Sequence, residues 1–292
     1  MPRHFLTGDE LSRDELLALL DRAAQLKREP LASRALEGRS VALLFEKPST
    51  RTRLSFEAGV FEMGGHPMIL TPEATQLSRG ESIRDSALVF SRHVAMIGVR
   101  THGDERLEEL AEHASVPVFN MLSAGHHPVQ ALADLLTLQE TFGRLEGLKV
   151  AYVGDGNNVA RSLAVLGSKV GVDVWVAAPV GYQLEESVPA TLVSEPEAAA
   201  QGAHAIYADV WVSMGDEETA DERRRALTPF KIDDALLDRG AEGCVALHCL
   251  PAHPGEEITA EVLYGERQRI WDQAENRRHA QKALLELLLA SE

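Results

Sequence analysis

Two hydrophobic periodicities alternate along the chain and predict its architecture. Short, continuous apolar runs alternate with longer segments in which apolar residues recur at the spacing of an amphipathic helix. A parallel sheet with crossover helices has this appearance, because its strands are buried on both faces. The apolar runs are SVALLF from 40, HPMIL from 66, HVAMIGV from 93, VPVFN from 116, LKVAYVG from 148, VDVWVAA from 172, AHAIYADV from 203 and CVALHCL from 244.

A long helical segment separates these runs into two series. PVQALADLLTLQETFGRLEG, residues 128–147, has apolar residues at helical spacing and stops at a glycine-containing segment. We therefore expect an α/β fold with two doubly wound parallel-sheet domains linked by helices. The expected domains are residues 1–135 and 136–272, with a C-terminal helix over 273–292 that packs back on the first domain. Residues 178–202 have the composition of a loop and little periodicity.

Composition and charge argue against several classes of protein. The chain of 292 residues has a net charge of −16, which argues against a nucleic-acid surface, because binding along a phosphate backbone requires a basic face. No run of about 18 apolar residues predicts a membrane span, and the N-terminal residues do not resemble a signal peptide. Cys244 and Cys249 provide no disulfide framework of the secreted kind. We expect a cytoplasmic protein.

The most unusual polar segment is FEKPSTRTRLSFE, residues 45–57. It follows an apolar run and precedes a helical pattern, so Ser49 is the predicted N-cap of a helix; Ser12 and Glu15 predict a capping box at the first helix. The N–H groups of the helix start, two threonine hydroxyls and two guanidinium groups, of Arg51 and Arg53, all suit an oxyanion. We expect a phosphate or carboxylate site, the alternative being a solvated, salt-bridged helix start. The GxxxxGK[ST] spacing of a nucleotide P-loop is missing.

Five motifs, in order, resemble one known family. FEKPSTRTRLSFE resembles the carbamoyl-phosphate motif of the aspartate and ornithine carbamoyltransferases. Arg100 ends an apolar run where that family has another phosphate-binding arginine, and His127 and Gln130 stand in its His-Pro-x-Gln signature. DVWVSMG, residues 209–215, and HCLP, residues 248–251, are similar to the ornithine branch, because the aspartate branch is expected to show His-Pro-Leu-Pro and no Ser-Met-Gly segment. The resemblance covers most of the chain.

The resemblance implies a set of residues that bind carbamoyl phosphate. Thr52, Arg100 and His127 would stabilise the oxyanion that forms when an amine adds to the carbonyl carbon, and Gln130 would hold the carbamoyl NH2 group. Without the resemblance, the simpler interpretation of His127 is a buried structural histidine or a cap, and we interpret His126 in that way. The residues implied for this ligand are Ser49, Thr50, Arg51, Thr52, Gln76, Arg100, His127, Gln130, Cys249, Leu250 and Arg277.

A second set of residues is implied for L-ornithine. GDGNNVA, residues 154–160, is similar to a dinucleotide-binding turn, but it lacks the third glycine, and the next apolar run ends without an acidic residue for a ribose. A dehydrogenase is therefore not expected. By resemblance, Asn158 contacts the α-carboxylate and α-amino groups of the amino acid, Asp209 contacts its α-ammonium, and Ser213 and the Met214 backbone close over it. For WVSMG alone, a plain glycine-containing turn is the alternative.

Cys249 is the residue for which alternative chemical roles differ most. Beside His248 and near His253, it fits a thiol nucleophile or a metal cluster, although adjacent strand residues point to opposite faces and should not converge on one zinc ion. A buried, inert thiol is a further alternative. The resemblance implies instead that Cys249 and the Leu250 carbonyl lie beside the attacking δ-amine and that Cys249 positions or relays a proton, without a covalent intermediate. It also implies a cis bond between Leu250 and Pro251.

The implied activity is transfer of a carbamoyl group from carbamoyl phosphate to the δ-amine of L-ornithine, which gives L-citrulline and phosphate. Arg100, His127, Cys249 and Thr52 are the implied catalytic residues, and no metal or organic cofactor is expected. The alternatives are the same transfer to putrescine or an acylated ornithine, and a noncatalytic anion-binding regulator.

The resemblance further implies a homotrimer or a multiple of trimers. Gln76, in the polar loop 75–82, would reach the phosphate site of a neighbouring subunit, and the sequence of this loop predicts that it is mobile. Residues 178–202 are shorter and less helical than the family suggests, so a helix of the second domain is expected to be lost there.

Overall fold

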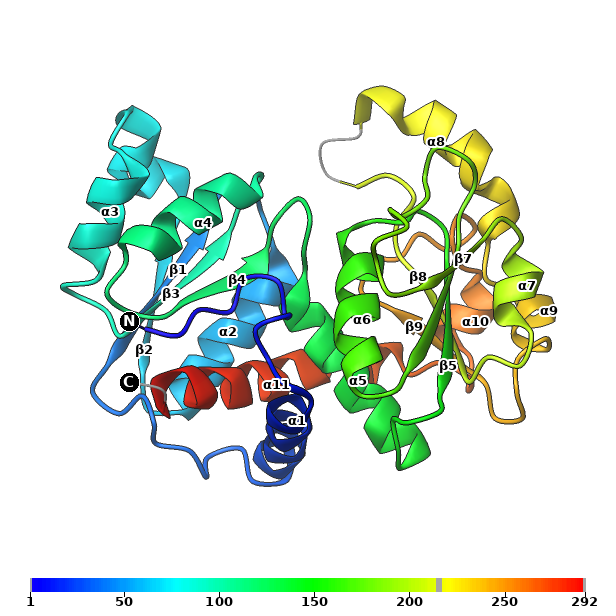
Figure 1. Ribbon diagram of the computed structural model, residues 1–292, viewed down its shortest axis with the longest axis horizontal. Helices are drawn as coiled ribbons and strands as arrows, with labels where there is room; N and C mark the ends of the chain where they lie inside the picture. The colour runs from blue at the N-terminus through cyan, green and yellow to red at the C-terminus, as the bar shows by residue number, and fades with distance from the viewer. Residues whose placement is uncertain (1, 214–216, 291–292) are drawn as a thin grey trace. The chain divides into compact units, whose positions relative to one another are not determined.

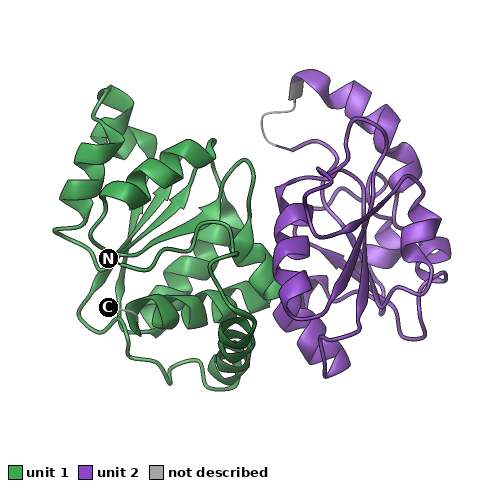
Figure 2. Ribbon diagram, viewed as in Figure 1, with its two compact units in different colours: residues 1–133, 275–292 green, residues 134–274 purple. Residues whose placement is uncertain are grey.

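The computed structural model, which describes residues 2–213 and 217–290, contains two parallel sheets (Figure 1). The chain divides into two units, unit 1 with residues 1–133 and 275–292 and unit 2 with residues 134–274 (Figure 2). The boundary lies inside helix α5, Pro128–Phe142, and the last helix, α11, Ile270–Ala290, returns the chain to unit 1. The predicted α/β class, with two doubly wound parallel sheets, is confirmed.

Unit 1 is built on four parallel strands in the order β2-β1-β3-β4. These strands are β1 Ser40–Phe45, β2 His66–Leu70, β3 Met96–Arg100 and β4 Val118–Leu122. Its helices, besides parts of α5 and α11, are α1 Arg13–Arg28, α2 Thr50–Glu62, α3 Ile83–Phe90 and α4 Asp104–His113. Two short 3-10 helices, η1 Pro72–Ala74 and η2 Gln76–Arg79, occupy the segment between β2 and α3.

The strand order of unit 1 reverses between β1 and β3. β1 pairs with β2 on one side and with β3 on the other, and Phe45 and Arg100, the last residues of β1 and β3, are partners in the register. In open α/β sheets, ligands bind outside the carboxyl ends of the strands at such a reversal. The segment after β1, which contains the Ser-Thr-Arg-Thr-Arg motif, and Arg100 therefore lie at the same edge of the sheet, where a ligand is expected.

Helix α11 is tied into unit 1 by one buried and one partly exposed charge pair. Lys282, which is fully buried, donates from Nζ to Oε2 of Glu62 at 2.5 Å and to the carbonyl of Pro30 at 3.0 Å. Near the end of the helix, Arg22 donates from Nε to Oε2 of Glu286 at 2.6 Å. Losing one partner of a buried pair is strongly destabilising, because the remaining charge is left without compensation. These pairs fix the position of α11, and with it that of Arg277 in unit 1.

Unit 2 has five parallel strands in the order β7-β6-β5-β8-β9, which reverses between β5 and β8. They are β5 Lys149–Val153, β6 Asp173–Ala177, β7 Thr191–Val193, β8 Ala205–Ala208 and β9 Val245–His248. The helices are α6 Asn158–Lys169, α7 Pro196–Ala200, α8 Ala220–Leu227, α9 Asp234–Leu237 and α10 Ala260–Tyr264, with 3-10 helices η3 Glu217–Thr219 and η4 Thr228–Phe230.

The segment 178–202 is more ordered than its composition predicts. It contains β7, which extends the sheet by pairing with β6, and α7, a helix of five residues. Both elements are too short for a periodic pattern to be recognised, and their formation depends on pairing with β6 and on burial of Ala199 and Ala200. Among the described residues, no helix has the length and hydropathy needed to cross a bilayer.

Candidate active site

Helix α2 begins where the sequence predicts. Ser49 is its N-cap, with its hydroxyl accepting from the backbone N–H of Thr52 at 3.3 Å. The first turn of an α-helix leaves backbone N–H groups without intrahelical partners and carries the positive end of the helix dipole. No acidic residue lies in this turn. The start of α2 therefore favours an anion at the carboxyl edge of the unit 1 sheet.

A buried arginine connects three distant parts of unit 1 at this edge. The guanidinium of Arg277, on α11, donates from Nη2 to Oγ1 of Thr52 at 2.6 Å and from Nη1 to Oε1 of Gln130 at 2.9 Å. Thr52 and Gln130 are each 1% exposed and Arg277 is 4% exposed. A buried guanidinium held by neutral partners keeps its full positive charge. The arrangement brings together three of the residues that the sequence assigns to carbamoyl phosphate.

His127 and Arg100 are also buried in unit 1. Burial lowers the pKa of His127 well below its usual value, and the positive charges of Arg277 and Arg100 lower it further. The imidazole is therefore neutral at pH 7, with one ring nitrogen that can donate a hydrogen bond without the ring carrying a charge. A neutral donor close enough to two guanidinium groups to feel both charges suits an anionic ligand or a developing oxyanion.

The two arginines of the motif have different surroundings. Arg51 is half-buried, whereas the side chain of Arg53 is 55% exposed and donates from Nε to Oε1 of Glu57 at 3.1 Å, one helical turn away. Residues two apart on a helix point in nearly opposite directions, so the two guanidinium groups diverge. The pair of Arg53 with Glu57 corresponds to the alternative interpretation of this segment, a solvated and salt-bridged helix start. Thr50 and Gln76 are exposed, the latter at the start of η2.

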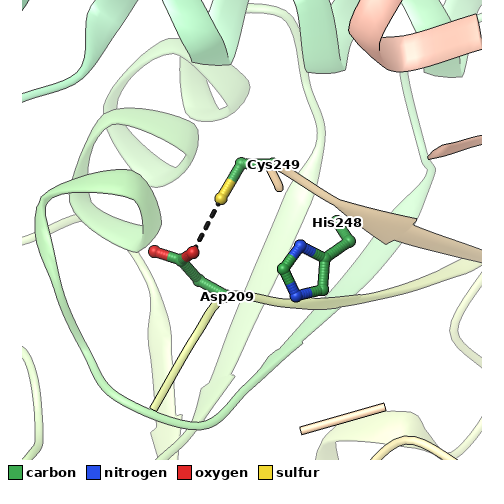
Figure 3. Close-up of side chains that lie close together, drawn as sticks. All are labelled: Asp209, His248 and Cys249. Carbon is green, nitrogen blue, oxygen red and sulfur yellow. Dashed lines mark hydrogen bonds between the residues drawn. The ribbon is translucent and has the colours of Figure 1, made fainter. Parts of the chain in front are cut away.

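In unit 2, a second group of polar side chains lies at the carboxyl ends of β5, β8 and β9. The thiol of Cys249, after β9, donates to Oδ1 of Asp209, after β8, at 2.8 Å (Figure 3). Oδ1 also accepts from the backbone N–H of Val210 at 2.8 Å, and Oδ2 accepts from Nδ2 of Asn157 at 2.8 Å. The switch point of this sheet, between β5 and β8, therefore carries a carboxylate held by three donors.

The predicted divergence of His248 and Cys249 is wrong. Ligand atoms of these residues and of Asp209 lie within 4.8 Å of one another, because β9 ends at His248 and the chain turns at once (Figure 3). Both imidazole nitrogens are nevertheless engaged: Nδ1 accepts from the N–H of Leu250 at 2.8 Å, and Nε2 lies 3.2 Å from Oε1 of Glu257. A metal ion would have to displace these contacts, so the donor set fits a hydrogen-bonded turn better than a metal site.

The geometry also limits what Cys249 does. A thiol that donates its proton to a carboxylate is in its protonated form, whereas a nucleophile must be a thiolate. The contact with Asp209 holds the thiol in place, as a positioning role requires. The Leu250–Pro251 bond that follows is cis, as predicted.

The remaining residues assigned to the amino acid lie in the same unit. Asn158 is the first residue of α6 and, like Ser213, is half-buried. Met214 lies outside the described residues. Asn158, Asp209 and Cys249 follow three strands that are neighbours in the sheet, which brings these residues to one edge.

Asn157 and Arg223 also contribute to this edge, although the sequence did not predict it. Asn157 caps α6 and contacts Asp209. Arg223, on α8, donates from Nε to the carbonyl of Trp211 at 2.7 Å and forms an ion pair with Asp155. The available signal was local for Asn157, an asparagine directly before a helical pattern. No sequence signal identified Arg223, because ion-pair partners on different elements have no fixed spacing in the sequence.

Family models cover almost the whole chain. The carbamoyl-P binding domain of the aspartate/ornithine carbamoyltransferases matches residues 3–140, and their Asp/Orn binding domain matches residues 146–288. The two matches correspond to the two halves of the chain in which the polar edges of the sheets lie.

Individual relatives agree with these models. An ornithine carbamoyltransferase of Acidothermus cellulolyticus is 52% identical, over 99% of this chain and 97% of that protein. The crystal structure of an ornithine carbamoyltransferase from Thermus thermophilus is 45% identical with a TM-score of 0.93, over 99% of both chains. One from Pyrococcus furiosus is 42% identical with a TM-score of 0.94, over 100% of this chain and 98% of that chain. The chain belongs to the aspartate/ornithine carbamoyltransferase family.

Proposed function

We propose that this protein transfers the carbamoyl group of carbamoyl phosphate to the δ-amine of L-ornithine, giving L-citrulline and phosphate. In this proposal, residues 1–135 with the C-terminal helix 273–292 bind carbamoyl phosphate, and residues 136–272 bind L-ornithine. The observation that carries the proposal is the buried cluster of Arg277, Thr52 and Gln130 beside His127 and Arg100. It supplies positive charge and neutral donors at one edge of a sheet, as a small dianion with a reactive carbonyl requires.

Each group at the edge of unit 1 has a role in binding carbamoyl phosphate. The phosphate is held by Arg277 and, at the N-terminus of α2, by Ser49, Thr50, Arg51 and Thr52. Arg100 lies between the phosphate and the carbonyl, neutral His127 donates to the carbonyl oxygen, and Gln130 holds the NH2 group. When the tetrahedral intermediate forms, the negative charge on the carbonyl oxygen is stabilised by Thr52, Arg100 and His127.

The edge of unit 2 orients the amino acid. Asp209 accepts from the α-ammonium, Asn158 contacts the α-carboxylate and α-amino groups, and Ser213 and the Met214 backbone enclose the ligand. Cys249 and the carbonyl of Leu250 lie beside the δ-amine. This arrangement leaves the δ-nitrogen as the nucleophile.

The reaction balances without a metal or organic cofactor. The δ-nitrogen forms a bond to the carbonyl carbon, the bond between that carbon and the phosphate oxygen breaks, and the phosphate leaves with the electron pair. The nitrogen loses one proton, which Cys249 positions or relays towards the departing phosphate. The guanidinium groups of unit 1 stabilise the charge that accumulates on the leaving group.

A panel of amine acceptors tests the proposed function directly. Purified protein with carbamoyl phosphate and L-ornithine is expected to form citrulline, whereas putrescine, an N-acylated ornithine and L-aspartate are expected to react poorly. Preference for one of those amines would replace L-ornithine as the substrate. Binding of carbamoyl phosphate without transfer to any amine would identify a noncatalytic anion-binding protein.

The rate is expected to rise with pH between 7 and 9. The δ-amine of ornithine resembles lysine, with a pKa near 10.4, so only about one molecule in 10³ is the free nucleophile at pH 7. Because the pKa of His127 is lowered, its imidazole remains neutral throughout this range and adds no titration of its own. Single-turnover citrulline formation at saturating substrates measures the profile. A rate independent of pH, with chemistry limiting, contradicts this expectation.

We further propose that the protein is cytoplasmic and assembles as a homotrimer or a multiple of trimers. Helix α2 exposes two large apolar side chains, Leu54 at 61% and Phe61 at 74%. They are seven positions apart and therefore lie on one face of the helix, where a second copy of the chain would cover them. In this assembly, Gln76 on η2 contacts the phosphate site of the neighbouring subunit.

Mixed trimers test whether the site is shared. If each site combines Arg51 of one chain with Gln76 of another, trimers of either Arg51→Ala or Gln76→Ala alone contain no intact site. Random refolding of the two variants together should restore about a quarter of the sites. Half of the subunits retain Arg51, and for half of these the neighbouring subunit that contributes residue 76 retains Gln76. Citrulline formation by the mixture, compared with each variant refolded alone, gives the answer. A rate equal to the average of the two parents in verified mixed trimers would show that Gln76 acts within its own chain.

A further inference from the structure

The side chain of Asn157 has its oxygen fully engaged within unit 2. Oδ1 accepts from the backbone N–H groups of Val159 at 2.9 Å and Ala160 at 3.2 Å, and from the hydroxyl of Tyr152 at 3.0 Å. Backbone N–H groups only donate, so the atom facing them must be the amide oxygen. The orientation of the amide is thereby settled, and Nδ2, a donor, faces the opposite direction.

That donor is directed at Asp209. Nδ2 of Asn157 lies 2.8 Å from Oδ2 of Asp209, while Oδ1 of the same carboxylate accepts from Cys249 and from the N–H of Val210. An ionised carboxylate accepts at about four positions, two on each oxygen. The two donors on Oδ1 fill that oxygen, and Asn157 takes one position on Oδ2. The remaining position is on Oδ2, the oxygen that Asn157 holds.

We propose that Asn157 is a positioning residue for the amino-acid substrate: it fixes Asp209 so that the open position of Oδ2 receives the α-ammonium group. The inference rests on the proposed function, since it assumes that Asp209 binds an amino acid. The inference gives the side chain of Asn157 two roles that can be tested separately. The oxygen caps α6, the helix that begins with Asn158, and the nitrogen orients the carboxylate.

Asn157→Asp separates these two tasks. Aspartate is an equally good N-cap, so the contacts of the oxygen are retained, while the donor to Asp209 is replaced by a second carboxylate oxygen. The Michaelis constant for L-ornithine is expected to rise about 10- to 100-fold at pH 8, the effect of losing a hydrogen bond to a charged group. The Michaelis constant for carbamoyl phosphate, which binds to unit 1, should stay within about twofold.

The pH dependence distinguishes positioning from a structural defect. Two carboxyl groups in contact share a proton at lower pH, and the protonated one again donates to the other. The ratio of ornithine Michaelis constants, Asn157→Asp over wild type, should therefore fall as the pH decreases from 9 to 6. A structural defect would leave this ratio unchanged and would lower the melting temperature.

Two further variants provide controls. Asn157→Ser keeps a capping oxygen but is too short to reach Asp209, so it should raise the ornithine constant at every pH without the recovery at low pH. Tyr152→Phe removes only the phenol contact to Oδ1 and should change that constant by about twofold at most.

The outcomes separate the inference from the proposed function. If wild type forms citrulline but Asn157→Asp and Asn157→Ser both retain its ornithine constant, the inference is overturned and the proposed function stands. Equal increases in both substrate constants also overturn it, because they indicate a general defect. If wild type forms no citrulline from ornithine, the proposed function fails and the inference fails with it.

Discussion

Replacing Arg277 with methionine is expected to lower kcat/KM for carbamoyl phosphate about 10²- to 10³-fold, the cost of removing one preorganised donor from a site that stabilises developing charge. Methionine has a similar volume and leaves the packing of α11 intact, but it leaves Thr52 and Gln130 without their buried partner. Steady-state kinetics with carbamoyl phosphate varied at saturating ornithine measure the loss. The melting temperature, followed in parallel, shows whether the fold is retained.

Two variants make the result specific. Arg277→Lys keeps the charge and should recover part of the activity, but not all of it, because an ammonium does not reproduce the two parallel donors of the guanidinium. Arg53→Met removes an exposed arginine of the Ser-Thr-Arg-Thr-Arg motif and should change kcat/KM by less than about twofold, since exposed ion pairs contribute little. Equal losses in Arg277→Met and Arg53→Met would contradict the assignment of the anion site to the buried cluster.

The same substitution should also change the ionisation of His127. The positive charge of Arg277 lowers the pKa of His127, although burial lowers it more. Removing the charge should therefore raise the pKa of His127, while burial keeps it below the usual value. NMR titration of the imidazole resonances in wild type and Arg277→Met measures this shift, and a decrease in the variant would contradict the electrostatic argument.

Replacing Asp209 with asparagine is expected to raise the Michaelis constant for L-ornithine about 10²- to 10³-fold, because a charge-assisted contact to the α-ammonium is lost and the new NH2 group faces donors. The existing donors are Nδ2 of Asn157 on one oxygen, and the thiol of Cys249 with the N–H of Val210 on the other. Whichever way the amide turns, it places a donor against a donor. The Michaelis constant for carbamoyl phosphate should remain close to that of wild type.

Asp221→Asn is the matched control for this prediction. Asp221 is also in unit 2, but its side chain is 94% exposed and lies 3.7 Å from Arg224 within the same helix. Its replacement should leave both Michaelis constants within about twofold. If Asp209→Asn binds ornithine as well as this control does, Asp209 is not the group that receives the α-ammonium.

Local chemistry accounts for most of what the sequence by itself determined. Apolar runs of five to seven residues predicted β1, β2 and β3, and the helical spacing after Pro128 predicted α5, because these patterns depend only on which neighbouring residues are buried together. The caps at Ser12 and Ser49 were predicted for the same reason, since a cap joins residues three positions apart. The order of the motifs predicted the family.

Only the tertiary structure decided which polar side chains meet. Arg277 and Thr52 are far apart in sequence, as are Cys249 and Asp209, and their contacts depend on strand order and on the return of α11 to unit 1. The tertiary structure also determined β7, a strand of three residues that pairs with β6. Contacts between distant segments leave no local periodicity, whereas capping and burial within one element do, and this difference determined what the sequence predicted.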